Sequence, residues 1–518
     1  MSKITRGGGT NGSERRLAAF AERTFLDLWS YPNTFIDKKQ HGAGTGKEFC
    51  DLFVVCGDDL IIFSDKYVQW PIARSIDVAW ARWYRKAIAS SVNQINGAVG
   101  WLNKHPDRIF IDPHCKTRIP IEMPDVRKRR VHGVVVSNGS NVACRQHYRD
   151  LSGTFVVNPH IKGGDHIDPS HEYYGPFSIG DVNPDAAFVH VFDTEALRIL
   201  FQELDTISDF TKYMNERSDF IRSGKLYFAA GEEDLLAHYL KYTDKSGEHK
   251  FLLRDDRPLR KKEVLAVEGG SYNHLRRMTQ YKLKKQADLV SYNWDRLIGR
   301  FTHHIIEGTN VRLYDDQPLG TFAEPALRIM AQETRVSRRS LGQQLIDSFD
   351  TAVAAKQPRF NRTILPHRKA GRRSDGKRVA YIFIIMSFMP EKFSGNDKYE
   401  LYRRLRANFL EALCYSVGYD YREATHAVAI GFDAPKAISG RSESSEDLVG
   451  IEFGPWTPEM EQHTLAERER LGIKSPRSLP TSFASVKEWS DNSSPIPSGL
   501  SRQARRAIER ASRKRDRH

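Results

Sequence analysis

Residues 46–66 read GKEFCDLFVVCGDDLIIFSDK. Two short apolar runs within them, at 52–55 and 60–63, are rich in the β-branched and aromatic residues that favour strands. The residues between the runs include Gly57-Asp58-Asp59, which is typical of a tight turn. Two such runs around a short turn predict a β-hairpin. We therefore expect a sheet built around this hairpin.

The predicted hairpin carries polar residues at its open end. Asp51 directly precedes the first apolar run, and Lys66 follows the second. Because alternate residues of a strand share a face, Ser64 and Lys66 point to one side and Asp65 points to the other. An aspartate that meets a lysine across a hairpin suits a metal-dependent phosphodiesterase. The carboxylate holds Mg²⁺, and the lysine orients or activates a water beside the phosphate.

Two helices are predicted on either side of the hairpin. Residues 13–29 repeat apolar side chains at three- and four-residue spacing, and Glu22 lies beside that apolar stripe, within reach of the sheet edge. Residues 80–102 form the second helix, on which Lys86 and Gln94 are eight residues apart and close to one face. These two side chains either contact substrate or belong to a solvated helix face.

This arrangement resembles the PD-(D/E)XK nuclease superfamily, whose domains have the restriction-endonuclease-like fold. Those domains carry an acid on an early helix, an Asp on one strand and a (D/E)-X-K triplet on the next. The matching residues here are Glu22, Asp51 and Ser64-Asp65-Lys66, so that the resemblance covers roughly residues 13 to 150. It implies cleavage of nucleic acid, DNA rather than RNA, with Mg²⁺ or Mn²⁺. Asp51 and Glu22 would hold the metal ion, and Lys66 would position the attacking water.

The triplet departs from the family pattern at its first position, where Ser64 stands in place of the second acid. Three explanations are open: Asp65 turns in through a local bulge, Glu22 or Glu48 supplies the second metal ligand, or the site is weakened. The third explanation leads to an alternative function. In that case the chain is a catalytically decayed nuclease fold that binds nucleic acid, or a scaffold for another protein.

The composition suits a partner with a phosphate backbone. Among 518 residues, 79 are Lys or Arg and 65 are Asp or Glu, which gives a net charge of +14. The five cysteines are scattered and odd in number, which is typical of a reducing compartment, so we expect a cytoplasmic protein. No stretch approaches the roughly 18 uninterrupted apolar residues of a membrane span, so we expect no membrane contact. The expected partners are nucleic acid, with DNA favoured, and a protein partner or a second copy of the chain.

The alternation of strand and helix patterns predicts an α/β (mixed α+β) protein of several units. The predicted boundaries are 1–12 (disordered N-terminus), 13–157 (nuclease-like sheet flanked by helices), 158–185 (linker), 186–364 (mainly helical, partly basic), 365–455 (smaller α/β unit) and 475–518 (Pro/Ser-rich, then basic tail).

A basic run at 127–130 lies within the nuclease-like domain. It either grips substrate phosphates, through Arg129 and Arg130, or forms a solvated loop. By analogy with the superfamily, defence against foreign DNA or DNA repair is the implied biological role.

Overall fold

A computed structural model gives the fold of the chain and describes residues 12–38, 45–149, 153–244, 248–254, 257–260, 263–309, 323–366, 376–436, 445–476, 481–484 and 488–489. Strands and helices alternate through these residues, which confirms the predicted α/β (mixed α+β) class. The segment predicted to be disordered, 1–12, and most of the predicted tail, 475–518, lie outside the described residues. Among the helices of the described ranges, none has the length and apolar character needed to cross a membrane.

The predicted hairpin lies at the centre of the first sheet. Its strands β2 (Lys47–Cys56) and β3 (Asp59–Tyr67) are antiparallel, with Leu52 opposite Phe63. The strand order is β1-β2-β3-β4-β7, and β3, β4 and β7 run parallel to one another. The remaining strands of this sheet are β1 (Ser30–Ile36), β4 (Arg130–Asn138) and β7 (Val189–Asp193).

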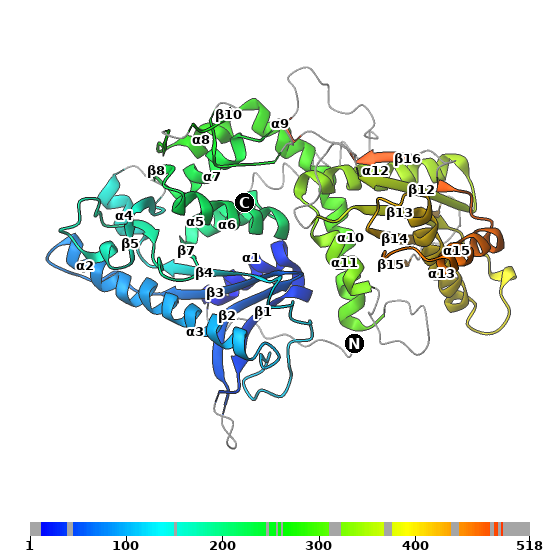
Figure 1. Ribbon diagram of the computed structural model, residues 1–518, viewed down its shortest axis with the longest axis horizontal. Coiled ribbons are helices and arrows are strands. Elements are labelled where there is room, and N and C mark those ends of the chain that lie inside the picture. The colour runs from blue at the N-terminus through cyan, green and yellow to red at the C-terminus, as the bar shows by residue number, and fades with distance from the viewer. Residues whose placement is uncertain are drawn as a thin grey trace.

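Helices cover both faces of this sheet (Figure 1). On one face, α1 (Gly12–Trp29) packs Phe25 against Phe63, with ring centroids 6.2 Å apart. On the other face, one nearly continuous helix comprises α2 (Ile76–Tyr84), a π-helical turn η1 (Arg85–Ala89) and α3 (Ser90–Lys104). This helix lies close to the sheet because β4 has a glycine beneath it: a Cβ at Gly133 would lie 2.7 Å from Ile95.

The first unit extends beyond its predicted end at residue 157, and the predicted linker 158–185 is a folded part of the molecule. The fifth strand of the first sheet, β7, follows this segment, and the segment itself contributes to a second sheet of order β11-β8-β5-β6. Trp80 Nε1 donates to the carbonyl oxygen of His166 at 2.7 Å, and His166 is buried. The Pro- and Gly-rich composition indicated a loop, because contacts between residues so far apart leave no local pattern. The elements concerned are β5 (Val156–Lys162), η2 (Gly163–Ile167), β6 (Ser178–Asp181), β8 (Leu226–Ala229) and β11 (Leu265–Val267).

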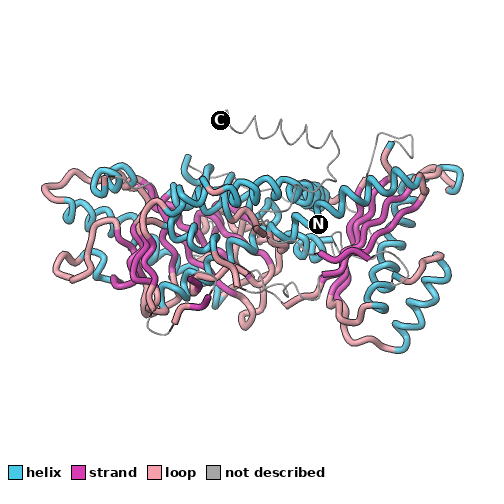
Figure 2. The backbone as a smooth tube through the Cα atoms, turned by 90° about the horizontal axis from the view of Figure 1, so that it is seen from above, coloured by secondary structure: helices cyan, strands magenta, loops and turns pink. Residues whose placement is uncertain are grey.

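Helices separate the first two sheets from the sheet of the C-terminal unit, as the view from above shows (Figure 2). Ion pairs hold these helices against one another: the buried Arg335 lies 2.8 Å from Asp205 and 2.7 Å from Asp295. The helices from residue 141 to residue 355 are α4 (Asn141–Tyr148), α5 (Thr194–Glu203), α6 (Ile207–Arg222), α7 (Glu232–Lys241), α8 (Ser271–Arg277), α9 (Thr279–Asp288), η3 (Leu289–Ser291), α10 (Tyr292–Glu307), α11 (Ala323–Ala331) and α12 (Arg335–Ala355), and a short strand pair is formed by β9 (Leu253–Arg254) and β10 (Arg257–Pro258).

The C-terminal unit is a five-stranded mixed sheet of order β15-β14-β13-β12-β16. Its two central strands are buried throughout, because α13 covers one face and α10 to α12 cover the other. Tyr381, for example, meets Trp294 of α10 with ring centroids 5.2 Å apart. The unit reaches past the predicted limits of 365–455 on both sides. Its elements are β12 (Arg359–Pro366), β13 (Val379–Met386), η4 (Pro390–Lys392), α13 (Lys398–Asp420), β14 (His426–Asp433), β15 (Glu446–Glu452), α15 (Pro458–Leu471) and β16 (Thr481–Ala484).

Candidate functional site

The register of the β2–β3 hairpin brings the predicted polar residues to one end of the sheet. Leu52 pairs with Phe63, so Asp51 stands opposite Ser64 in the continuing register. Opposite residues of an antiparallel pair share a face, and Lys66 follows Ser64 on that same face. Lys66 is exposed, whereas Asp51 and Ser64 are buried. The strand alternation agrees with the expected position of Ser64 and Lys66 on one side, with Asp51 at the same end of the hairpin.

This face of the hairpin is covered by α3. Ser64 Oγ donates a hydrogen bond to Gln94 Oε1 at 3.0 Å, which fixes the orientation of the glutamine amide. Gln94, predicted to contact substrate, is thus next to the hairpin. Lys86 is exposed and lies in the π-helical turn η1, one of the rare helical irregularities that are frequent at functional sites.

Asp51 has an unusual electrostatic environment. Its side chain is 9% exposed, and its Oδ2 accepts a hydrogen bond from the backbone N–H of Asp65 at 2.6 Å. The pKa of Asp51 is raised to about 8, chiefly by burial; the hydrogen bond from the Asp65 N–H lowers this pKa, and the carboxyl groups of Glu48, which hydrogen-bonds Asp51, and of Glu14 contribute to raising it. The carboxyl groups thus gather where a cation would relieve their repulsion.

Glu48 reaches Asp51 because of a β-bulge. Between Thr34 and Phe35 of β1 the pairing with β2 advances by two residues, so that Phe49 is left without a partner. An extra residue of this kind reverses the alternation of faces, and it brings Glu48 and Asp51 to the same side of β2. Of the ligands considered to replace the family's second acid, Glu48 is therefore the one that the structure places in contact with Asp51.

The acid of α1 that lies near Asp51 is Glu14 and not the expected Glu22. Glu14 is buried, accepts a hydrogen bond from Asn33 Nδ2 at 3.1 Å, and contributes to the raised pKa of Asp51. Glu22 lies on the exposed side of the same helix, about two turns further along. The apolar stripe was compatible with either residue, since both positions border it.

A matched pair of variants tests this assignment. We expect Glu14→Gln to lower the apparent Mg²⁺ affinity about tenfold, because it removes a buried carboxyl group that acts on Asp51. Glu22→Gln should leave this affinity unchanged. Isothermal titration of the full chain with Mg²⁺ measures both. A larger effect of Glu22→Gln would return that residue to the site.

Asp65 is directed away from Asp51, as strand alternation predicts, which disfavours the alternative in which it turns in through a bulge to replace the missing acid. Its Oδ1 accepts a hydrogen bond from Asn138 Nδ2 at 2.6 Å, on the α1 side of the sheet. Its Oδ2 is buried and has no hydrogen-bond partner within the described ranges. Burial raises the pKa of Asp65, although hydrogen bonds from Ser13 and Asn138 oppose the shift. Asp65 therefore acts on the site through its backbone N–H.

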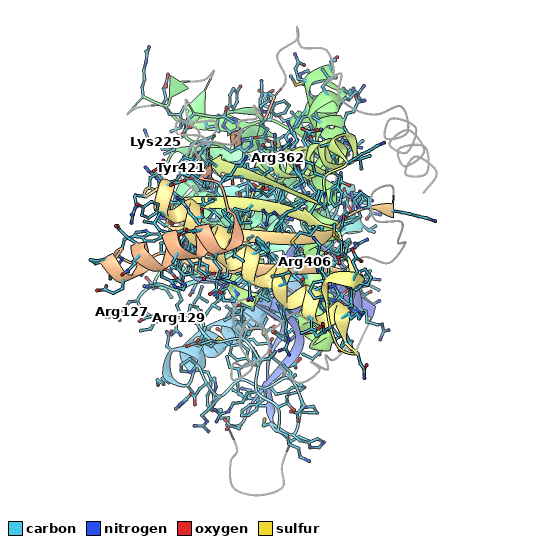
Figure 3. The ribbon with its side chains drawn as sticks, turned by 90° about the vertical axis from the view of Figure 1, so that its right-hand side faces the viewer. Arg127, Arg129, Lys225, Arg362, Arg406 and Tyr421 are labelled. Carbon is cyan, nitrogen blue, oxygen red and sulfur yellow. The ribbon has the colours of Figure 1, made fainter. Side chains whose placement is uncertain are left out.

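Arg129 and Arg130 lie away from this end of the sheet. Arg130 is opposite Asp59 at the start of β3 and forms an ion pair with it at 2.6 Å. The start of β3 is seven residues from Lys66, or roughly 23 Å. Arg129 donates to Asn103 Oδ1 at 2.6 Å, and it is labelled beside its neighbour Arg127 in Figure 3. Arg130 is thus paired with Asp59 at the opposite end of β3 from Lys66, and a contact of Arg129 and Arg130 with substrate phosphates stays a prediction.

A groove of about 680 Å³ adjoins Glu48. It runs between α3 on one side and the end of β1 and start of β2 on the other. Three lysines and one glutamate line it, so its charge is net positive. The lining residues are Ile36, Lys38, Lys47, Glu48, Phe49, Ser90, Asn93, Gln94, Gly97, Ala98, Gly100, Trp101, Lys104 and His105.

The carboxylates at the hairpin fit a magnesium ion. In the described part of the chain, no three His, Cys, Asp or Glu side chains form a metal-holding group. Mg²⁺, however, is usually held by one or two carboxylates, with water and substrate phosphate completing its coordination. Asp51 and Glu48 supply such a pair, because their carboxyl groups are in hydrogen-bond contact.

Comparison with protein-family models, with curated proteins and with solved structures finds no match to this chain. The residues of the site therefore carry the functional conclusions that follow.

Proposed function

We propose that this protein is an Mg²⁺-dependent nuclease that hydrolyses phosphodiester bonds, in DNA rather than RNA, with its site at the open end of the β2–β3 hairpin. The observation that carries the proposal is the contact between Asp51 and Glu48 on the hairpin face that also presents Lys66. Two carboxyl groups that can hold a metal ion and an ammonium group at the same end of the sheet suit the hydrolysis of a phosphodiester.

The residues of the site have different roles in the proposed reaction. Asp51 and Glu48 would hold Mg²⁺, which, when bound, polarises the phosphate and lowers the pKa of a water. Lys66 holds an ammonium group next to the phosphate, where it orients the attacking water and stabilises the charge that develops on the phosphoryl oxygens. Ser64 keeps Gln94 in place through its hydrogen bond, and thus serves the site without being a metal ligand.

The arrangement of the first sheet supports the resemblance to the PD-(D/E)XK superfamily. Three antiparallel strands, β1 to β3, are followed by a helical connection and by the parallel strand β4. The early helix supplies a buried acid, Glu14. The proposal also includes a cytoplasmic, reducing location, since all five cysteines are free thiols, and a role in defence or repair.

Nuclease assays with Lys66→Ala test the proposal. The parent protein should cut plasmid and linear DNA with Mg²⁺ or Mn²⁺ but not with EDTA, and Lys66→Ala should lower the rate about 10²- to 10³-fold because it removes a charge that acts on the transition state. Lys392→Ala, an exposed lysine of η4 in the C-terminal unit, is the control and should cut as the parent does. Cutting that persists in EDTA, or that survives Lys66→Ala, would contradict the proposal.

The alternative is a catalytically decayed fold that binds nucleic acid or another protein, and Ser64 is the observation that favours it. The salt dependence of DNA binding separates these functions. A parent protein that fails to cut but loses affinity steeply with salt is a nucleic-acid binder, whereas one without such binding is a scaffold.

A further inference from the structure

We propose that the groove between α3 and the β1–β2 strands binds an unpaired strand of nucleic acid, so that the site acts on single strands or frayed ends and not within a continuous duplex. This inference rests on the proposed function, because it names the substrate class of the same site. It follows from the size of the groove, its charge, one aromatic side chain and the shape of α3.

The volume of the groove selects one strand over two. A cavity of about 680 Å³ is within the range of small-molecule sites, roughly 300 to 1,000 Å³, and so accommodates a short piece of one strand. Specific duplex contacts instead spread over an open protein surface of about 1,000 to 2,500 Å². Here the walls stand on two sides, with α3 facing Ile36 and Lys47.

The charges of the groove suit a phosphate backbone that leads to the carboxyl pair. Lys38 and Lys47 line one wall and Lys104 lines the other, with Glu48 as the single acid of the lining. All three lysines are exposed and therefore accessible to phosphates. A positive groove that follows the backbone is the general feature of proteins that bind single strands.

Trp101 adds an aromatic side chain to the lining of the groove. Contacts with Arg108 hold both its indole N–H and its ring in place. Its Nε1 donates to the carbonyl oxygen of Arg108 at 3.2 Å, and the Arg108 guanidinium lies 5.3 Å from the ring centroid. Asp37 in turn holds Arg108 at 3.0 Å. Base–aromatic stacking is the second general feature of single-strand binding, and it tolerates any base.

The face of α3 that lines the groove leaves room for a ligand. Asn93, Gly97, Gly100 and Lys104 recur at helical spacing and all line the groove. A Cβ placed at Gly97 or at Gly100 would meet nothing within 4 Å. Packing within the protein therefore does not require a glycine at either position. Because both glycines lack a side chain, the groove is wider at these two positions.

Filling the groove tests the inference. Gly97→Leu and Gly100→Leu add side chains to open space in a helix, where leucine is favoured over glycine, so the thermal midpoint should not fall. Gly299→Leu in α10 is the matched control, since a Cβ there also meets nothing within 4 Å. Anisotropy of fluorescein-labelled oligo-dT, oligo-rU and a blunt duplex of equal length, measured in EDTA with the full chain, gives affinities without cleavage.

We expect the parent to bind oligo-dT or oligo-rU more tightly than the duplex. The ratio of the oligo-dT and oligo-rU affinities then decides between DNA and RNA. Gly97→Leu should weaken single-strand binding about tenfold, whereas Gly299→Leu should not. Lys104→Gln should reduce the slope of log K against log salt by about 0.7 if it contacts one phosphate. Equal or tighter duplex binding, no binding of any probe, or unchanged binding by Gly97→Leu would each overturn the inference. Failure of the proposed nuclease appears instead as absent cleavage with this binding intact.

Discussion

Asp51→Asn should lower Mg²⁺-dependent cleavage more than about 100-fold and, at the same time, make the protein more stable near neutral pH. The first effect follows because the substitution removes a carboxylate that would hold the metal ion, and loss of a direct ligand exceeds the 10- to 100-fold cost of losing a supporting residue. The second effect follows from the raised pKa of Asp51, about 8. Asparagine is always neutral, and its Oδ1 still accepts the hydrogen bond from Asp65 N–H.

The gain in stability depends on pH in a defined direction. The pKa of Asp51 is higher in the folded protein, about 8, than in the unfolded chain, about 3.9. Its protonated form therefore stabilises the fold fully below about pH 4, and this contribution is lost as the pH rises through about 8. The shift limits the pH-dependent change in the free energy of unfolding to about 6 kcal/mol, and we expect Asp51→Asn to stabilise the fold by about 2 kcal/mol at about pH 8.5 and by little at about pH 4.5.

Thermal unfolding with and without Mg²⁺ provides a readout besides cleavage. A ligand that binds only the folded state at 100 times its dissociation constant stabilises it by about 2.7 kcal/mol, so Mg²⁺ should raise the midpoint of the parent and not that of Asp51→Asn. Ser208→Ala, on α6, controls for the loss of a part-buried polar group away from the hairpin. An Asp51→Asn variant that still responds to Mg²⁺ would place the metal elsewhere.

The sequence predicted those parts of the fold that have a local pattern. The hairpin was predicted from two apolar runs around Gly57, and the buried strand β13 from eight consecutive residues without a charge. The second sheet was missed. Its short strands have four residues or fewer, apart from β5, and they are fixed by distant contacts such as that of Trp80 with His166. Residues 158–185, which contribute to this sheet, were predicted to be a linker from their composition alone.

The site was predicted in outline, and its second acid was left among several candidates. Asp51, Ser64 and Lys66 follow from strand alternation, which depends only on sequence spacing. Glu48 depends on the bulge at Phe49, and a bulge is set by the pairing with β1, which the sequence does not display. Glu14 was missed because it shares the apolar border of α1 with Glu22, and only the tertiary packing distinguishes two positions on one helix face.

Arg406→Met should destabilise the C-terminal unit by about 3 to 5 kcal/mol, because it removes a buried guanidinium that pairs with Asp433 and Asp447, of which Asp447 keeps an ion pair with Arg403. Arg406 is fully buried on α13, and it lies near the sheet in Figure 3. Its Nη1 donates to Asp433 Oδ1 at 2.6 Å, and its Nε donates to Asp447 Oδ2 at 2.8 Å. Asp433 ends β14 and Asp447 is the second residue of β15, so one guanidinium links both strands to the helix. Methionine fills much of the same volume but pairs with neither acid.

Three further variants separate this electrostatic cause from a simple loss of packing. Arg404→Met, an exposed arginine two residues earlier on α13, should change stability by less than about 0.5 kcal/mol. Arg406→Met combined with Asp433→Asn and Asp447→Asn should recover most of the loss, because neutral amides do not need a cation. Urea-dependent hydrogen exchange of β13 and β14 reports the stability of this unit alone. If the triple variant is no more stable than Arg406→Met, packing of the arginine stem and not its charge holds α13 on the sheet.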